Sequence, residues 1–174
     1  MKKFELTTES ITNEAGKKLF RIKALIDFGD VKAGELGGYV EKEGNVSQDD
    51  NAWVSGDAEV FGNAKVSGDA RVYGDARVSG NAEVFGNAKV SGNARVYGDA
   101  DYALVQGFGT EFRCTTFYRG KDKKIMVNCG CFHGNLEAFR KQAKETRSGK
   151  IAKEYLMIAD LMEYHFASED SSDE

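Results

Sequence analysis

Three cysteines and one histidine in the C-terminal part of the sequence have the residue types of a metal site. In the stretch NCGCFH, Cys129, Cys131 and His133 alternate, so a strand here would place their side chains on one side. If the chain before this stretch turns back at residues 121–122, Cys114 comes to lie opposite Cys129. Three thiolates and one imidazole held together in this way would match a Cys3His zinc site.

Other interpretations of these residues stay open. Cysteine is often a buried apolar residue, and zinc ligands are usually separated by two or more residues, which favours core cysteines. A Cys114–Cys129 disulfide or redox pair is a further alternative. No second motif pairs a base with a thiol, which argues against a nucleophilic cysteine. We therefore predict that the protein needs no cofactor, with a structural zinc ion on these four residues as the alternative.

The elements that would position these side chains follow a repeated array, which runs from Gly44 to Ala103 and contains no histidine and no cysteine. Gly, Asp or Asn, Ala and Val recur in it every six residues, as in GDARVYGDARVSGNAEVF. A six-residue period with one inward aliphatic and one inward small residue is typical of a parallel β-helix. Valine and alanine would point inward from short strands, while glycine and Asn or Asp would occupy corners that require positive φ. We predict a mainly β protein built on this array.

The charged residues of the array predict how many hexads make one coil. The sequence itself nearly recurs every 24 residues, but a 24-residue coil would stack Glu59 on Glu83 and Lys65 on Lys89. Like charges on neighbouring strands are unfavourable. A coil of 18 residues instead stacks Glu59 on Arg77 and Lys65 on Glu83. We therefore predict a short triangular prism, with three hexads per coil and a little over three coils.

Positions that vary from hexad to hexad point outward and are the candidates for binding a partner. An outward aromatic residue alternates with serine along the array, and a coil of 18 residues stacks every aromatic ring against a serine. Trp53 takes an outward position otherwise held by charged residues, so it is either covered by the N-terminal segment or exposed as an anchor. A contiguous aromatic band would mark an interface. The candidate partner-binding residues are Trp53, Phe61, Arg71, Tyr73, Arg77, Phe85, Lys89, Arg95 and Tyr97.

Segments with other patterns flank the array on both sides. Residues 1–43 contain strand patterns, and we expect them to form an N-terminal β cap. Residues 104–167 predict a hairpin that turns at 120–123, and then two helices, the second over 151–166, which together make a ββαα module. Asn135 is the expected N-cap of the first helix. An open coil end exposes unpaired backbone groups, so we expect both segments to cover the ends of the array.

Composition and charge limit the classes of function. The tail 168–174 carries four acidic side chains, and we expect it to be disordered. Without these four, acidic and basic side chains are equal in number, which argues against direct binding of nucleic acid. No apolar run is long enough to span a membrane, the N-terminus lacks the apolar segment of a secretory signal, and an odd number of cysteines suits a reducing compartment. We expect a cytoplasmic protein.

The array resembles the left-handed β-helix of hexapeptide-repeat proteins, and the left-handed coil is implied by that resemblance. That family includes acyltransferases, whose catalysis typically relies on a histidine near the coils, and γ-type carbonic anhydrases, which hold zinc with histidines. The array lacks histidine and cysteine, which argues against both activities. The segments FRIKALIDFGDVKAGELGGYV and CGCFHGNLEAFRKQAKET resemble parts of small repeat proteins encoded by bacteriophages and prophages. That resemblance implies a bacterial host cytoplasm and a non-enzymatic role.

Three hypotheses for the function follow. The first, which we favour, is a protein-binding module, by analogy an inhibitor of a host defence protein such as a CRISPR-Cas nuclease. The array has nine acidic and five basic side chains, so a local acidic stripe could compete with nucleic acid. The second is a self-associating structural β-solenoid similar to bactofilins, in which two caps favour a closed dimer or trimer over open stacking. The third is an enzyme, either an acyltransferase relative or a site between array and cap that uses Cys131, His133 or His165.

Overall fold

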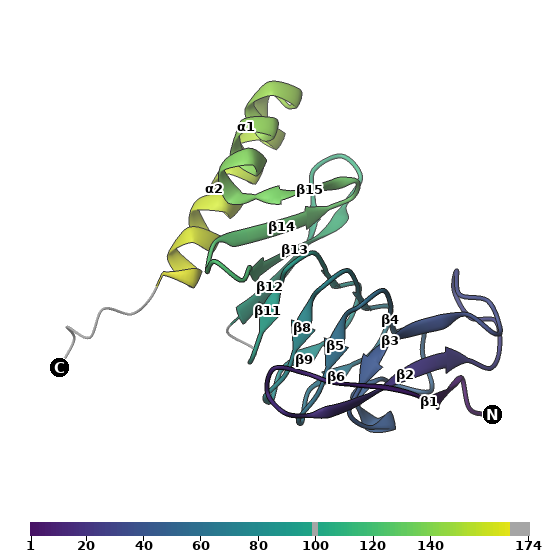
Figure 1. Ribbon diagram of the computed structural model, residues 1–174. Coiled ribbons are helices and arrows are strands. Elements are labelled where there is room, and N and C mark those ends of the chain that lie inside the picture. The colour runs from purple at the N-terminus through teal and green to yellow at the C-terminus, as the bar shows by residue number, and fades with distance from the viewer. Residues whose placement is uncertain (99–100, 168–174) are drawn as a thin grey trace.

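The computed structural model describes residues 1–98 and 101–167 as an elongated, mainly β molecule. The array forms a parallel β-solenoid, with the N-terminal strands at one end and a sheet with two helices at the other (Figure 1). The tail 168–174, which we predicted to be disordered, lies outside the described residues.

The N-terminal strands extend one face of the solenoid. They run antiparallel to one another, and the third pairs in parallel with the first coil through Tyr39 and Glu59. The resulting sheet has the order β1-β2-β3-β5-β8-β11. A short 3-10 helix, η1 (Glu43–Asn45), then leads into the array. The strands of this segment are β1 (Phe4–Thr12), β2 (Lys18–Ala24) and β3 (Leu36–Val40).

The solenoid has three faces, and each hexad contributes a strand of two residues. Glu59 pairs with Arg77, and Lys65 with Glu83, which confirms the predicted coil of 18 residues. The three faces are β3-β5-β8-β11, β4-β7-β10 and β6-β9. The strands are β4 (Trp53–Val54), β5 (Glu59–Val60), β6 (Lys65–Val66), β7 (Arg71–Val72), β8 (Arg77–Val78), β9 (Glu83–Val84), β10 (Lys89–Val90) and β11 (Arg95–Val96).

Valine and alanine fill the inside of the solenoid, as the pattern predicts. Every alanine and valine from Ala52 to Val96 is completely buried. Each buried valine stabilises the fold by about 1.5–3 kcal/mol relative to an exposed one. The corners are held by glycines with positive φ, such as Gly80, where an added Cβ would lie 2.1 Å from the backbone oxygen of Tyr97. The repeat is therefore explained by burial along the strands and by close backbone packing at the corners.

Side chains from the N-terminal segment seal the first coil. Asn45 is completely buried, and its Nδ2 donates to the backbone oxygens of Gly62 (3.2 Å) and Ala64 (2.8 Å). The Nζ of Lys3, a residue only 2 % exposed, donates to the backbone oxygen of Ala52 (2.8 Å), and burial lowers the pKa of this amine. These donors take the place of the backbone N–H groups that a preceding coil would supply.

Side chains from the C-terminal sheet seal the last coil in the same way. Inside the solenoid, Arg71 donates its N–H to the backbone oxygen of Ala88 in the next coil (2.9 Å). The equivalent N–H of Lys89 has no next coil, and it donates instead to Oγ1 of Thr116 (3.0 Å). The Nδ2 of Asn128 donates to the backbone oxygen of Lys89 (2.7 Å). Both groups of Lys89 that face the cap are therefore satisfied by side chains.

The C-terminal module contains two strands more than the ββαα pattern that the sequence predicts. Its antiparallel sheet has the order β12-β13-β14-β15, and α1 and α2 pack on one face of it. The first additional strand, β12, begins at Tyr102, where the pattern still resembles a hexad, and the second, β15, has only four residues. The elements are β12 (Tyr102–Phe108), β13 (Arg113–Arg119), β14 (Ile125–Cys129), β15 (Phe132–Asn135), α1 (Leu136–Thr146) and α2 (Gly149–Phe166).

Both predicted helices are confirmed. The Oδ1 of Asn135 accepts a hydrogen bond from the N–H of Ala138 (2.8 Å), so this residue is the N-cap of α1. The apolar stripe of α2 packs on the sheet in a second core, with Ile158, Ala159, Met162 and Phe166 all buried. Among the described residues, neither α1 nor α2 combines the length with the apolar character that a membrane span requires.

Candidate functional site

Trp53 is covered by the N-terminal segment, which settles one alternative that the sequence left open. The side chain is 2 % exposed. The rings of Phe28 and Phe4 contact it edge-on, with centroids 5.4 Å and 6.2 Å from its own. Gly37 permits this packing, because a Cβ there would lie 2.7 Å from the indole. Trp53 therefore joins the cap to the solenoid and is not an exposed anchor.

Three arginines of the candidate set already have partners within the chain. Arg71 forms an ion pair with Asp30, and Nη1 of Arg77 donates to Glu14 at 2.5 Å, which lowers the pKa of that carboxyl group. Nη1 of Arg95 donates to the backbone oxygen of Asp75, at a corner of the preceding coil, and to that of Ala94, its own neighbour in the chain. The acidic partners come from the N-terminal segment, so the first two arginines hold that segment against the solenoid.

These acidic partners also explain how the 18-residue coil tolerates like charges. The register that pairs Glu59 with Arg77 also stacks Arg71 on Lys89, and Arg77 on Arg95. Such stacks are unfavourable by themselves. Asp30 and Glu14 reach these arginines from outside the array, as described above. Lys89 remains exposed, and its charge faces solvent.

The aromatic residues of the array do not form a continuous band. Phe61 and Tyr97 lie on one face, with Ser79 stacked between them, whereas Tyr73 and Phe85 follow the strands of the other two faces. The stacking of every aromatic ring against a serine is thus confirmed. Tyr97 is 58 % exposed and Phe85 57 %. Each face therefore presents separate rings rather than one apolar patch.

The predicted opposition of Cys114 and Cys129 is wrong by one residue. Cys129 lies opposite Thr115, whose hydroxyl donates to its sulfur at 3.1 Å. The reason is the hairpin turn, which has one residue more than we assumed and places Lys123 at a φ of 62°. Neighbouring residues of a strand face opposite sides of the sheet, so this shift separates the two thiols.

The alternation of Cys129, Cys131 and His133 on one strand is also wrong. Gly130, with a φ of 60°, and Cys131 form a tight turn, and Cys129 pairs across it with Phe132. Cys129 packs toward the helices, whereas Nδ1 of His133 lies 2.6 Å from Oδ1 of Asn128, on the face that covers the solenoid. Within residues 1–98 and 101–167, no group of three or more His, Cys, Asp or Glu side chains is arranged to hold a metal ion.

A small cleft in the C-terminal module, with a volume of about 50 Å³, was not found by sequence reasoning, because several separate elements line it. The Cys129 thiol lies beside the Tyr155 hydroxyl, and burial raises the pKa of this tyrosine. Arg113 and Arg147 lie close enough to favour its ionised form, which partly opposes this effect. The lining includes Thr110, Glu111, Arg113, Cys129, Phe132, Phe139, Gln142, Thr146, Arg147 and Tyr155. Glu111 lies 4.0 Å from Nη2 of Arg113 in this lining, and no base in the cleft is paired with a nucleophile.

Comparison with known families supports the solenoid. Residues 64–80, 70–86 and 88–100 match the YdcK beta solenoid repeat. These matches lie within the array and cover less than half of the chain, so the likeness concerns the repeat. No curated protein matches the chain. Together with the three-faced coil, the match makes this chain a repeat protein of the β-solenoid class.

Proposed function

We propose that this chain is a structural scaffold, a short closed β-solenoid that acts by binding proteins, its own copies included, rather than by catalysis. The observation that carries this proposal is the sealing of both coil ends. Asn45 and Lys3 complete the hydrogen bonds of the first coil, and Thr116 and Asn128 complete those of the last. A coil sealed at both ends has no free strand to stack on another coil, so its assemblies have a fixed size.

The composition of the solenoid supports a structural role. The inward side chains of its strands are buried valine and alanine, which are unreactive, and two of its three outer arginines, Arg71 and Arg77, hold the N-terminal cap. A preformed surface of this kind loses little conformational entropy when it binds a partner. This arrangement favours a rigid support over an enzyme.

A narrower form of this function is the binding of a host defence protein, such as a CRISPR-Cas nuclease, by a phage-encoded chain in the bacterial cytoplasm. Its support is the resemblance of the flanking segments to phage and prophage proteins. Affinity purification of the tagged protein from phage-infected cells tests it. Recovery of a defence protein in stoichiometric amount is the expected result, and a bait that recovers none contradicts this narrower form.

Light scattering over a wide range of concentrations tests the closed scaffold. We expect the mass of the native protein to reach a plateau as the concentration rises. A double variant, Thr116→Val with Asn128→Leu, removes the seal of the last coil and should aggregate more readily, because Lys89 then has unpaired backbone groups. A native protein whose mass grows without limit would contradict the proposal.

A further inference from the structure

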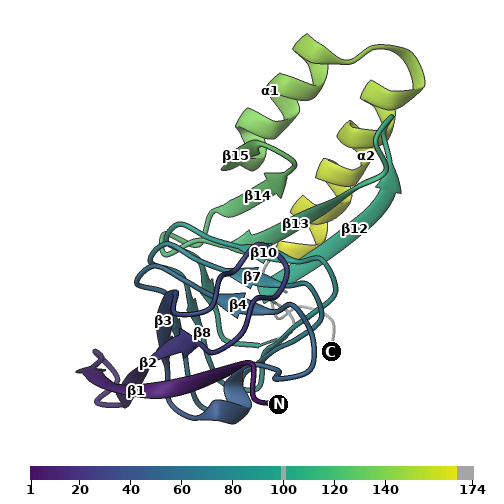
Figure 2. The same cartoon turned by 90° about the vertical axis from the view of Figure 1, so that its right-hand side faces the viewer.

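A cavity of about 270 Å³ lies on the solenoid face formed by β4, β7 and β10. Figure 2 shows these three strands one above the other. The loop between β2 and β3 supplies the rest of the lining, so the solenoid and the N-terminal segment enclose the cavity together. Its volume is several times that of the cleft in the C-terminal module, which is about 50 Å³.

Two cations lie side by side in this cavity. Arg71 and Lys89 pair in register on β7 and β10, and paired strands lie about 4.8 Å apart. Like charges in this arrangement repel each other. Arg71 forms an ion pair with Asp30, whereas the exposed amine of Lys89 forms none within residues 1–98 and 101–167. An anionic group that reaches both cations would therefore be attracted to the cavity.

The two carboxylates of the lining do not fill this role. Asp30 is 83 % exposed, and it holds Arg71 from the loop between β2 and β3. The carboxylate of Glu35 accepts a hydrogen bond from the N–H of Lys32 (3.2 Å), within its own loop. Exposed ion pairs such as that of Asp30 contribute little to stability. A ligand with a larger negative charge can therefore replace Asp30 at Arg71.

Three neutral donors of the lining lack an acceptor. Among the described residues, Nε1 of Trp53 has no hydrogen-bond partner, although this side chain is only 2 % exposed. The hydroxyl groups of Ser55 and Tyr73 also donate to no group in the part of the chain that the structure describes. A buried N–H without an acceptor is costly. The cavity thus offers donors for which the chain itself supplies no oxygen.

We propose that this cavity binds a phosphate group, either inorganic phosphate or the phosphate of a small phosphomonoester. A phosphomonoester carries about 1.5–2 negative charges at pH 7 and several acceptor oxygens. These oxygens accept hydrogen bonds from Arg71, Lys89 and the indole N–H of Trp53, and Asp30 gives up its ion pair. A carboxylate has one charge and would only replace what Asp30 supplies. The site is additional to the scaffold function and does not depend on it.

The single tryptophan of the chain allows a direct test, because the one indole N–H signal in a nitrogen–proton correlation spectrum belongs to Trp53. Titration with inorganic phosphate, and separately with phenyl phosphate, is carried out at constant ionic strength. Both probes should shift this signal until it saturates. Tighter binding of phenyl phosphate would identify a phosphomonoester, and equal affinities would show that the phosphate group alone is recognised. An indole signal that neither probe shifts overturns the proposal.

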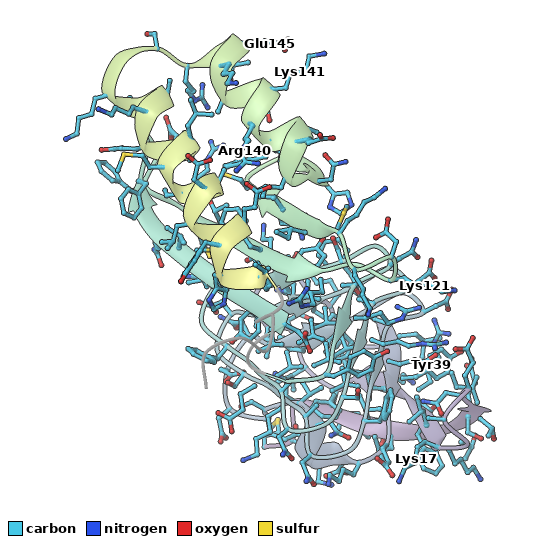
Figure 3. All side chains as sticks on the ribbon, turned by 90° about the vertical axis from the view of Figure 1, so that its left-hand side faces the viewer. Lys17, Tyr39, Lys121, Arg140, Lys141 and Glu145 are labelled. Atoms are coloured by element: carbon cyan, nitrogen blue, oxygen red, sulfur yellow. The ribbon has the colours of Figure 1, made fainter. Side chains whose placement is uncertain are left out.

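Lys89→Ala and Lys65→Ala are matched variants, since both lysines lie in the same hexad sequence, GNAKVS. Lys65 lies on another face, in register with Glu83. We expect the dissociation constant for inorganic phosphate to rise about tenfold in Lys89→Ala and to stay unchanged in Lys65→Ala. Lys141→Ala controls for the loss of net charge, because Lys141 lies on α1, far from the N-terminal segment (Figure 3). Equal losses in all three variants would refute a site at Lys89.

Asp30→Asn tests the competition for Arg71 and has an effect of opposite sign. Without the carboxylate of the loop, the dissociation constant for inorganic phosphate should fall about two- to fivefold. A purely structural role of Asp30 would leave phosphate binding unchanged or weaken it, and either result would overturn the contact of the phosphate with Arg71. Thermal unfolding checks that each variant folds.

Discussion

Two corner glycines have the same backbone conformation but different surroundings. Gly80 and Gly86 have φ values of 65° and 63°; a Cβ on Gly80 would lie 2.1 Å from the oxygen of Tyr97, whereas nothing lies within 4 Å of one on Gly86. We expect Gly86→Ala to lower the free energy of unfolding by about 1 kcal/mol through its positive φ. Gly80→Ala should lower it by about 3 kcal/mol or more, because the backbone must also move. Urea denaturation measures both values, and equal losses would contradict this account.

The carboxylate of Glu41 should make stability depend on acidity. The N–H of Gly62 donates to it at 2.6 Å, and this bond, with the amine of Lys17, lowers its pKa below the usual 4.5. The stability that a lowered pKa provides is complete above about pH 4.5 and is lost as the pH falls through the folded-state pKa. We expect the free energy of unfolding to fall less on acidification in Glu41→Gln than in the native chain, and denaturation at several pH values measures this. The surface variant Glu145→Gln is the control. If the free energy of unfolding of Glu41→Gln depends on pH as steeply as that of the native chain, the prediction is refuted.

Single residues show what the sequence could and could not predict. The outward direction of Arg71 and Arg77 follows from the six-residue period, but their partners Asp30 and Glu14 come from two loops outside the repeat. No local pattern predicts such a contact. The proposed zinc site failed for a different reason, because one additional turn residue, Lys123, moved Cys129 to the other side of the sheet from its expected partner.

The two helices of the C-terminal module begin differently, which allows a matched test of capping. The side chain of Asn135 accepts a hydrogen bond at the start of α1, whereas the side chain of Ser148, at the start of α2, makes none. Asn135→Ala should lower the free energy of unfolding by about 1 kcal/mol, and Ser148→Ala by much less. Thermal unfolding, monitored by circular dichroism, measures the loss of stability in both variants. Similar losses in the two variants would show that the cap of α1 contributes nothing measurable.

Elements with a repeated or amphipathic pattern could be predicted, and elements defined only by their partners could not. The solenoid strands and α2 place apolar residues at regular intervals, so burial determines them locally. β12 begins inside the last hexad, where the sequence alone does not show that its partner changes from a coil to β13. β15 has four residues, one of them glycine, and its pairing with β14 depends on the turn before it.

At the scale of the whole molecule, one strand joins the two cores. Along β13, Phe117 is completely buried in the core under the helices, and Tyr118 is completely buried in the core of the solenoid. Alternate side chains of a strand point to opposite faces, so β13 takes part in both cores. The hydroxyl of Tyr118 also lies 3.3 Å from that of Ser91 in the last coil. We therefore expect the solenoid and the C-terminal module to unfold together.

Calorimetry of two variants at this strand tests the coupling. Tyr118→Ala empties the position that closes the solenoid, and we expect it to lower the free energy of unfolding by about 3–5 kcal/mol and to split the transition into two. Tyr118→Phe keeps the ring and loses only the hydrogen bonds of the hydroxyl to Ser91 and to Nδ1 of His133, so it should retain a single transition with a loss of about 1 kcal/mol. If Tyr118→Ala still unfolds in one transition, the two cores are coupled through other contacts, such as the bonds of Thr116 and Asn128 to Lys89. The split is expected because those contacts are single hydrogen bonds, whereas the completely buried ring of Tyr118 is part of the apolar core of the solenoid.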